Sequence, residues 1–210
     1  MRILFQGDSI TDANRNRSEL TGFNAYGCGY PNFVAGQLCC ERPGEYTFID
    51  RAVSGDRVTD LYTRWRKDCI QLRPDVISIL IGVNDVWHEL GNGNGVPTPR
   101  FEKILSMLID ETMEELPGTR FLLMTPFVVN ASATKDHWDY FRTEVAERAA
   151  AMERVAAARS IPVLRLQPLF DRALTRQPAD YWTLDGVHPS HAGHALIAKA
   201  WIEAFDRMLG

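Results

Sequence analysis

Ser9 is the first residue of the sequence whose type and position suit catalysis. It stands in Gly7-Asp8-Ser9, directly after the short apolar run from Ile3 to Phe5. If that run is a strand, the serine hydroxyl lies on a tight turn at the carboxyl end of the strand, where a nucleophile would be accessible. Gly-Asp-Ser is also an ordinary turn composition, so this segment alone does not establish a function.

A carboxylate and an imidazole occur together near the other end of the sequence. Asp185 precedes His188 by three residues in Asp185-Gly186-Val187-His188. A serine hydroxyl attacks a carbonyl at neutral pH only when a base takes its proton, and an imidazole does this best when a carboxylate fixes its tautomer. Ser9, His188 and Asp185 fit these roles, although an isolated Asp-x-x-His more often caps a helix.

Two other segments offer donors for the negative charge that develops during acyl transfer. Gly55 follows the apolar run from Thr47 to Ile49, and its small size lets its backbone N–H approach a ligand closely. Asn84 follows the run from Val76 to Ile81, and its side-chain amide is a neutral donor. Such donors make up an oxyanion hole, but glycine and asparagine are also common in turns.

Five short apolar runs alternate with helical patterns, which predicts an α/β fold. Runs that are apolar throughout suit parallel strands covered on both faces. We therefore expect a doubly wound, flavodoxin-like three-layer α/β/α sandwich with a five-stranded parallel sheet, formed by residues 1–210 as one domain. Ligands bind such sheets beyond the carboxyl ends of the strands. The expected strands are Ile3 to Phe5, Thr47 to Ile49, Val76 to Ile81, Phe121 to Met124 and Val163 to Leu166.

Apolar stripes at helical spacing predict helices around residues 101–109, 141–155 and 196–208. Three segments without such periodicity are long for connections, and connections of this length are usually functional rims or covers. They are Ser9 to Tyr30, Trp87 to Pro99 and Thr125 to Asp139.

The composition limits the class of protein. The formal charge of −4 and the 45% of hydrophobic residues exclude a disordered chain and a basic nucleic-acid binder. No apolar stretch approaches the length of a membrane span, and the first residues do not resemble a secretory signal, so a cytoplasmic location is favoured. The four cysteines lack CxxC spacing, and we expect buried free thiols, with Cys39 and Cys40 as small core residues of a helix.

Taken together, four segments resemble the SGNH, or GDSL, hydrolase superfamily. They are Gly7-Asp8-Ser9-Ile10, Gly55, Gly82-Val83-Asn84-Asp85 and Asp185-Gly186-Val187-His188, in the order of that family. The resemblance implies that Ser9 is the nucleophile, His188 the general base and Asp185 its orienting acid. It also implies an oxyanion hole formed by Ser9, Gly55 and Asn84, and a reaction that needs no cofactor or metal.

A narrower similarity links the chain to bacterial carbohydrate acetylesterases, especially acetylxylan esterases. It lies in Gly82 to Trp87, Met124 to Phe127 and Val187 to His194, and in the extended motif Gly7 to Asp12. We therefore expect removal of short acyl groups, above all acetyl, from small-molecule or oligosaccharide esters. Self-association is suggested by the same relatives, and neither nucleic acid nor membrane is expected as a partner.

Three residues are candidates for binding that substrate, namely Asp8, Trp87 and Trp182. Trp87 lies three residues after Asn84 and Trp182 three before Asp185, so their indole faces would flank the reacting centre, where they suit sugar rings. Both tryptophans are equally compatible with a packing role.

Other functions remain open at this stage. A lysophospholipase or an acyl-thioester hydrolase would use the same residues, and a carbohydrate-binding protein on this fold would have lost the chemistry. His188, His191, His194 and Asp185 also form an alternative metal-binding set. That set is incomplete for a tight site, so we expect His191 and His194 on a helix surface or in packing.

Overall fold

A computed structural model describes residues 1–210. Its strands are β1 (Arg2–Gly7), β2 (Thr47–Asp50), β3 (Val76–Leu80), β4 (Arg120–Met124) and β5 (Val163–Leu164). They form one sheet in the order β2-β1-β3-β4-β5, and every pairing is parallel. This is the strand order of flavodoxin-like doubly wound folds. The predicted five-stranded parallel sheet is confirmed.

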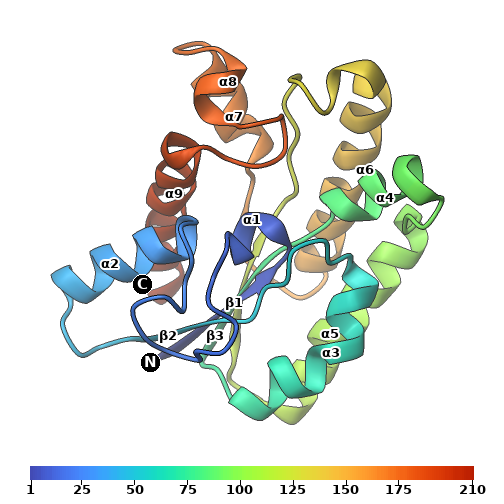
Figure 1. Ribbon diagram of the computed structural model, residues 1–210. Coiled ribbons are helices and arrows are strands. Elements are labelled where there is room, and N and C mark those ends of the chain that lie inside the picture. Colours follow the sequence, from blue (N-terminus) through green and yellow to red (C-terminus); the bar gives the residue numbers. More distant parts are fainter.

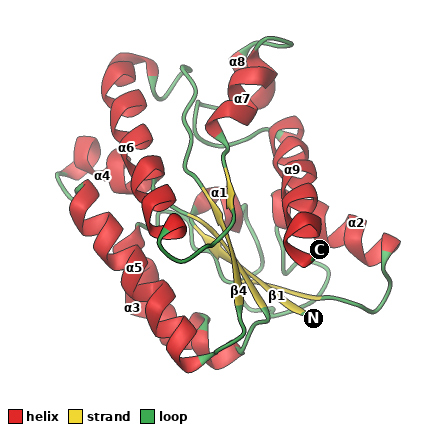
Figure 2. Cartoon of the chain, turned by 180° about the vertical axis from the view of Figure 1, so that it is seen from behind, coloured by secondary structure: helices red, strands yellow, loops and turns green.

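Helices cover both faces of the sheet (Figures 1 and 2). The long ones are α2 (Tyr30–Glu41), α3 (Val58–Asp68), α5 (Thr98–Glu115), α6 (Trp138–Ala157) and α9 (His191–Leu209). The shorter ones are α1 (Ser9–Asp12), α4 (Val83–Asn92), α7 (Gln167–Leu174) and α8 (Ala179–Trp182), with 3-10 turns at Ile70–Leu72 and Lys135–His137. Helices α2 and α9 pack together on one face, and α3, α5 and α6 line the other. None of these helices combines the length and apolar character needed to cross a lipid bilayer.

Strand β3 shows why the apolar runs are uninterrupted. All five of its residues are buried. Val76 and Leu80 face the core beneath α2 and α9, whereas Ile77 and Ile79 face the core beneath α3 and α5. Because successive side chains of a strand point to opposite faces, a strand between two helical layers must be apolar at almost every position.

The one polar residue of β3, Ser78, joins the sheet to the last helix. The indole Nε1 of Trp201 on α9 donates a 2.8 Å hydrogen bond to the Ser78 hydroxyl, and both residues are fully buried. The Trp201 ring stacks on Phe205 with 4.8 Å between ring centroids. This contact fixes α9, whose first turn lies at the carboxyl edge of the sheet.

The segment Trp87 to Pro99, expected as a long connection, is partly helical. Helix α4 continues to Asn92 and ends at Gly93, which has a left-handed φ of +66°. Val83 and Val86 at helical spacing are buried, and their packing outweighs the cost of Gly91 within the helix.

The expectation of buried cysteines is correct for Cys69 and wrong for Cys28, Cys39 and Cys40, which are exposed. Cys39 and Cys40 do lie on helix α2, as predicted. However, the buried side of α2 contains Val34, Ala35 and Leu38, so the next two residues fall outside that stripe.

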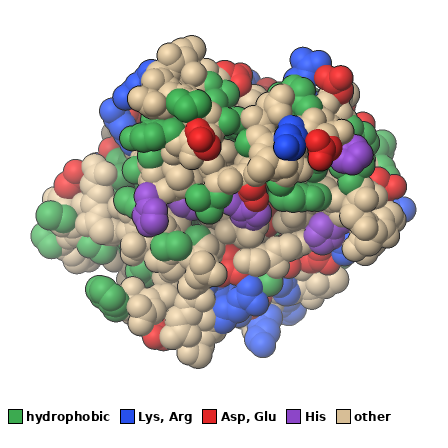
Figure 3. Space-filling model, turned by 45° about the horizontal axis from the view of Figure 1, so that its top comes forward, with side chains coloured by type: hydrophobic (Ala, Val, Ile, Leu, Met, Phe, Trp, Pro, Cys, Tyr) green, Lys and Arg blue, Asp and Glu red, His purple; other side chains and the backbone are tan.

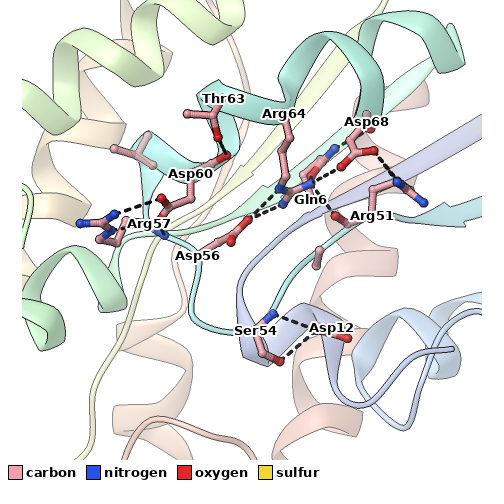
Figure 4. Close-up of polar contacts among 12 residues, drawn as sticks. Gln6, Asp12, Arg51, Ser54, Asp56, Arg57, Asp60, Thr63, Arg64 and Asp68 are labelled. Atoms are coloured by element: carbon pink, nitrogen blue, oxygen red, sulfur yellow. Dashed lines mark hydrogen bonds and ion pairs between the residues drawn. The ribbon is translucent and has the colours of Figure 1, made fainter. Parts of the chain in front are cut away.

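The connection from β2 to α3 is held by Arg64, a residue of α3 (Figure 4). The Arg64 Nε donates a 2.8 Å hydrogen bond to the Asp56 carboxylate. Its Nη1 donates to the Arg51 carbonyl oxygen at 2.6 Å, to Gln6 Oε1 at 3.0 Å and to Asp68 Oδ2 at 3.2 Å. One guanidinium therefore ties both ends of the connection to β1 and α3.

The middle of the same connection is bound to helix α1. The backbone N–H and the hydroxyl of Ser54 both donate to Asp12 Oδ2, at 2.8 and 2.9 Å. Arg17 also pairs with this carboxylate, at 2.5 Å. Burial alone would raise the pKa of Asp12, but these hydrogen bonds lower it, so the carboxylate is ionised at neutral pH.

We predict that Trp201→Ala lowers the free energy of unfolding by about 4 kcal/mol, because it leaves a large cavity between α9 and the sheet. Urea denaturation measures this loss. Glu203→Ala, at an exposed position of the same helix, should change the stability by less than about 0.5 kcal/mol. Similar losses in the two variants would contradict the prediction.

Arg64→Met should lower the free energy of unfolding by about 3 kcal/mol, because the Asp56 and Asp68 carboxylates would remain partly buried without their cation. The matched control is Arg66→Met on the same helix. Arg66 pairs with Glu115 in solvent, with 70% and 45% of the two side chains exposed, so its loss should cost no more than about 1 kcal/mol. Equal denaturation midpoints for the two variants would show that the contacts of Arg64 contribute no more to stability than the exposed ion pair of Arg66.

Candidate active site

Ser9 lies at the carboxyl edge of the sheet, where α1 begins. Asp8 caps this short helix, because its side chain accepts a 3.0 Å hydrogen bond from the Ile10 N–H. A Cβ at position 7 would approach the Leu80 carbonyl oxygen to 2.4 Å. Gly7 is therefore required for the close approach of β1 and β3 directly before the serine.

Ser9, His188 and Asp185 form a continuous hydrogen-bonded chain. Ser9 Oγ lies 2.8 Å from His188 Nε2, and His188 Nδ1 lies 2.7 Å from Asp185 Oδ2. The other oxygen of Asp185 accepts hydrogen bonds from the backbone N–H groups of Val187 and His188, at 2.9 and 2.8 Å. Three side chains from the two ends of the sequence are thus brought into contact in the expected order.

The backbone around His188 is set by its contacts with the connection after β4. Gly186 has a φ of +108°, and a Cβ there would lie 2.5 Å from the Val129 carbonyl oxygen. The Val129 N–H donates to the Gly186 carbonyl at 2.8 Å, and the Ala133 N–H donates to the Asp185 carbonyl at 2.9 Å. Only glycine fits this turn, which holds the Asp185 carboxylate 2.7 Å from His188 Nδ1.

The charges of the pair favour an ionised Asp185 and a basic His188. Burial alone would raise the pKa of Asp185, but hydrogen bonds from the His188 side chain and from two backbone N–H groups outweigh it and lower the pKa. The hydrogen bond to Asp185 raises the pKa of His188, with desolvation opposing it. When His188 is neutral, Nδ1–H donates to the ionised carboxylate, so Nε2 accepts from the serine hydroxyl.

Gly55 and Asn84 lie near each other on two separate segments. The Asn84 amide nitrogen donates a 3.1 Å hydrogen bond to the Asp56 carbonyl oxygen, one residue after Gly55. This bond uses one of the two amide hydrogens and leaves the other free. Gly55 has a φ of +88°, and its N–H has no acceptor within the chain. The arrangement offers a backbone donor and a side-chain donor on neighbouring segments.

Two buried carboxyl groups lie beside these donors. Both oxygens of Asp85 lie within 3.2 Å of the Val58 N–H, at the start of α3. Burial raises the pKa of Asp85 to about 8 and the pKa of Asp8 to about 7. Asp85 is therefore largely protonated at neutral pH, and its hydrogen bond holds the end of the segment that contains Gly55.

The three residues expected to bind substrate differ in their surroundings. Asp8 is buried and engaged as a helix cap, and Trp182 is buried with its Nε1 donating to the Gln177 carbonyl at 3.2 Å. Trp87 is only half-buried, and its ring centroid lies 6.0 Å from that of His188. Of the three, Trp87 alone flanks the hydrogen-bonded chain as expected.

A cavity of about 360 Å³ opens beside Ser9 and His188. The carboxyl edge of the sheet faces the viewer in Figure 3, where several histidine side chains lie among hydrophobic ones. Leu184 and His194 line this cavity although neither was predicted to do so from the sequence, where each flanks a recognised motif. The full lining is Ser9, Ile10, Ala13, Asn14, Cys28, Ser54, Leu184, His188, Pro189, Ser190, His191 and His194.

Two of the three histidines considered as metal ligands form hydrogen bonds within the protein. His188 bonds to Ser9 and Asp185, and the Nδ1 of His194 accepts a 3.1 Å hydrogen bond from the Tyr30 N–H. No three His, Cys, Asp or Glu side chains are arranged to hold a metal ion.

Comparison with known proteins agrees with this geometry. Residues 5–196 match the GDSL-like lipase/acylhydrolase family. An acetylxylan esterase from Geobacillus stearothermophilus is 34% identical over 209 residues, which cover 96% of this chain and 92% of the relative.

Solved structures give the same result. A crystal structure from Parabacteroides merdae, described as that of a GDSL-like lipase, superposes with a TM-score of 0.93 at 36% identity and covers 98% of this chain and 95% of its own. The structure of the Geobacillus acetylxylan esterase gives a TM-score of 0.87 at 32% identity, covering 97% and 93% of the two chains. Together with the family match, these likenesses confirm the resemblance found in the sequence: the chain belongs to the GDSL-like lipase/acylhydrolase family and is a carboxylic ester hydrolase.

Proposed function

We propose that the protein removes acetyl groups from carbohydrate esters such as acetylated xylo-oligosaccharides, through an acyl-serine intermediate. The observation that carries this proposal is the hydrogen-bonded chain from Ser9 through His188 to Asp185, which borders an open cavity. The similarity to an acetylxylan esterase supports the choice of substrate.

The proposed reaction begins when Ser9 Oγ attacks the ester carbonyl carbon and passes its proton to His188 Nε2. The tetrahedral intermediate collapses, the sugar oxygen leaves with the proton from His188, and the acetyl group remains on Ser9. A water molecule then gives a proton to His188 and attacks the acyl-serine, which releases acetate and restores the serine. Asp185 stays ionised and stabilises the imidazolium form of His188 in each half of the cycle.

The oxyanion of each tetrahedral intermediate needs donors already in place. We assign this role to the backbone N–H groups of Ser9 and Gly55 and to the second amide hydrogen of Asn84. The bond from Asn84 to the Asp56 carbonyl supports the assignment, because it ties the Asn84 amide to the residue that follows Gly55. Arg64 in turn restrains Asp56, so these donors are preorganised.

Family relatives support the same roles. Three structures of the Geobacillus enzyme are described as catalytic mutants in which a serine, an aspartate or a histidine has been replaced by alanine. These are the residue types of Ser9, Asp185 and His188.

We predict that Ser9→Ala lowers kcat on an aryl acetate by several powers of ten, because the covalent route is lost. Steady-state kinetics measure the rate. The unfolding temperature should stay near that of the wild type, since the hydroxyl contributes only its bond to His188. Near-normal turnover by this variant would refute the assignment of the nucleophile.

The rate should also depend on pH. Since the hydrogen bond to Asp185 raises the pKa of His188, kcat/KM should fall on acidification with an apparent pKa above the free imidazole value of about 6.5. Asp8, whose own pKa is raised by burial to about 7, also raises the pKa of His188 to the extent that it is ionised. We therefore predict that Asp8→Asn shifts the acidic fall in kcat/KM, the acid limb of the pH–rate profile, to lower pH. The asparagine oxygen still accepts the hydrogen bond from the Ile10 N–H.

The control for this experiment is Asp139→Asn, which removes a carboxylate at an exposed position of α6. Its acid limb should coincide with that of the wild type. An unchanged limb in Asp8→Asn would contradict the electrostatic link between Asp8 and His188.

The substrate class is tested by comparing acyl chains and alcohols. Aryl esters from acetyl to octanoyl, acetylated xylo-oligosaccharides, a lysophospholipid and an acyl thioester are assayed side by side. Preference for the acetyl esters and turnover of the oligosaccharides support the proposal. Preference for octanoyl esters or for the lysophospholipid would contradict it, and failure of an organophosphate to label Ser9 would exclude the acyl-serine route.

A further inference from the structure

His194 lies in the first turn of α9, and only 7% of it is exposed. Its ring nevertheless lines the cavity that Ser9 and His188 also line. The side chain is thus more than nine-tenths buried in the wall of this cavity. Burial of an imidazole costs free energy unless its nitrogens form hydrogen bonds.

One ring nitrogen has a partner that fixes the tautomer. The Tyr30 N–H donates a 3.1 Å hydrogen bond to His194 Nδ1, so this nitrogen carries no hydrogen. Burial lowers the pKa of His194 to about 4, and the nearby His191 and His188 contribute in the same direction. At neutral pH the ring is therefore neutral, and its hydrogen is on Nε2.

The bond through Nδ1 is the one hydrogen bond of this ring within the chain, and Nε2 is not among the completely enclosed atoms that lack a partner, so it remains accessible at the cavity. The ring cannot easily turn away, because its helix is locked in place. A Cβ at Gly193 would lie 2.2 Å from the Trp182 carbonyl oxygen, and Ser190 caps the helix through the Gly193 N–H at 3.2 Å. His194 thus offers a neutral donor of fixed direction in the wall of the cavity.

The position of this donor indicates which part of a substrate it meets. In the proposed reaction His188 gives its proton to the leaving sugar oxygen, so the alcohol part must lie on the His188 side of Ser9. The donor on His194 shares its cavity with His188, and the Gly55 and Asn84 donors proposed for the oxyanion are not part of that lining.

We propose that His194 binds the alcohol part of the substrate, with its Nε2–H donating to a hydroxyl or ring oxygen of the sugar. This inference rests on the proposed function and deepens it. A neutral donor suits an uncharged, polyhydroxylated ligand. Asn14 and Ser190 add polar groups to the same lining, and Leu184 and Pro189 add apolar surface for the C–H faces of a sugar ring.

Two substitutions separate the roles of the two ring nitrogens. In His194→Asn, the side-chain oxygen replaces Nδ1 as the acceptor for the Tyr30 N–H, and the shorter amide carries its own N–H groups short of the position of Nε2, so the donor is withdrawn from the cavity. In His194→Gln, the longer amide places an N–H near the position of Nε2. Each variant is assayed on an acetylated xylo-oligosaccharide and on 4-nitrophenyl acetate, whose leaving group lacks sugar hydroxyls.

We expect His194→Asn to raise KM for the oligosaccharide about tenfold with little change in kcat, as for the loss of one hydrogen bond made equally in the ground and transition states. On 4-nitrophenyl acetate, kcat/KM should stay within about twofold of the wild type, because no partner is lost. His194→Gln should recover most of the affinity for the oligosaccharide. His137→Asn, at an exposed position outside the cavity lining, serves as the control.

Several outcomes would overturn the inference. An unchanged KM for the oligosaccharide in His194→Asn would show that the substrate forms no hydrogen bond with His194. A parallel loss on both substrates would show that His194 acts by positioning the site, and thermal unfolding of each variant identifies a simple loss of folding. If the wild type cleaves 4-nitrophenyl acetate but not the oligosaccharide, the proposed function itself is wrong. The inference about His194, which rests on it, is then wrong as well.

Discussion

The hydrogen bond between Ser9 and His188 is the constraint on which the remainder of the site depends. It joins residues 179 positions apart at a distance of 2.8 Å. Such a bond forms only if β1 and the turn before α9 end at the same edge of the sheet. The parallel sheet ensures this, because the carboxyl ends of its strands lie together. The packing of Trp201 against Ser78 then fixes α9 at the height that brings His188 to the serine.

The strands and the central residues of the site could be predicted from the sequence because both leave local signals. A strand between two helical layers is apolar at nearly every position, as β3 is. Ser9, Asn84 and His188 each stand in a motif at the end of an apolar run or before a helix. Helix α4 was harder to predict, because its glycine and asparagine residues suggest a loop and only the burial of Val83 and Val86 stabilises it.

The features that the sequence did not predict depend on partners far away along the chain. Asp8 and Trp182 are buried by neighbouring segments, which no local pattern reports. The tautomer of His194 is set by the N–H of Tyr30, a residue 164 positions earlier. Arg64 bonds to the side chain of Gln6 on β1 and to Arg51 and Asp56 at the two ends of the connection from β2 to α3. In each case the residue type was visible, but its role follows only from tertiary contacts.

Ion pairs are distributed unevenly around Ser9. The connection with Gly55 is restrained by Arg64 and Asp12 along its whole length. The wall of the cavity also contains Asn14, Cys28 and Leu184, which come from irregular segments and take no part in these bonds. Substitution of these three residues leaves the contacts of Arg64 and Asp12 in place. A protein engineer, or natural divergence, has room there to change the range of accepted alcohols while the acyl-transfer apparatus is inherited unaltered.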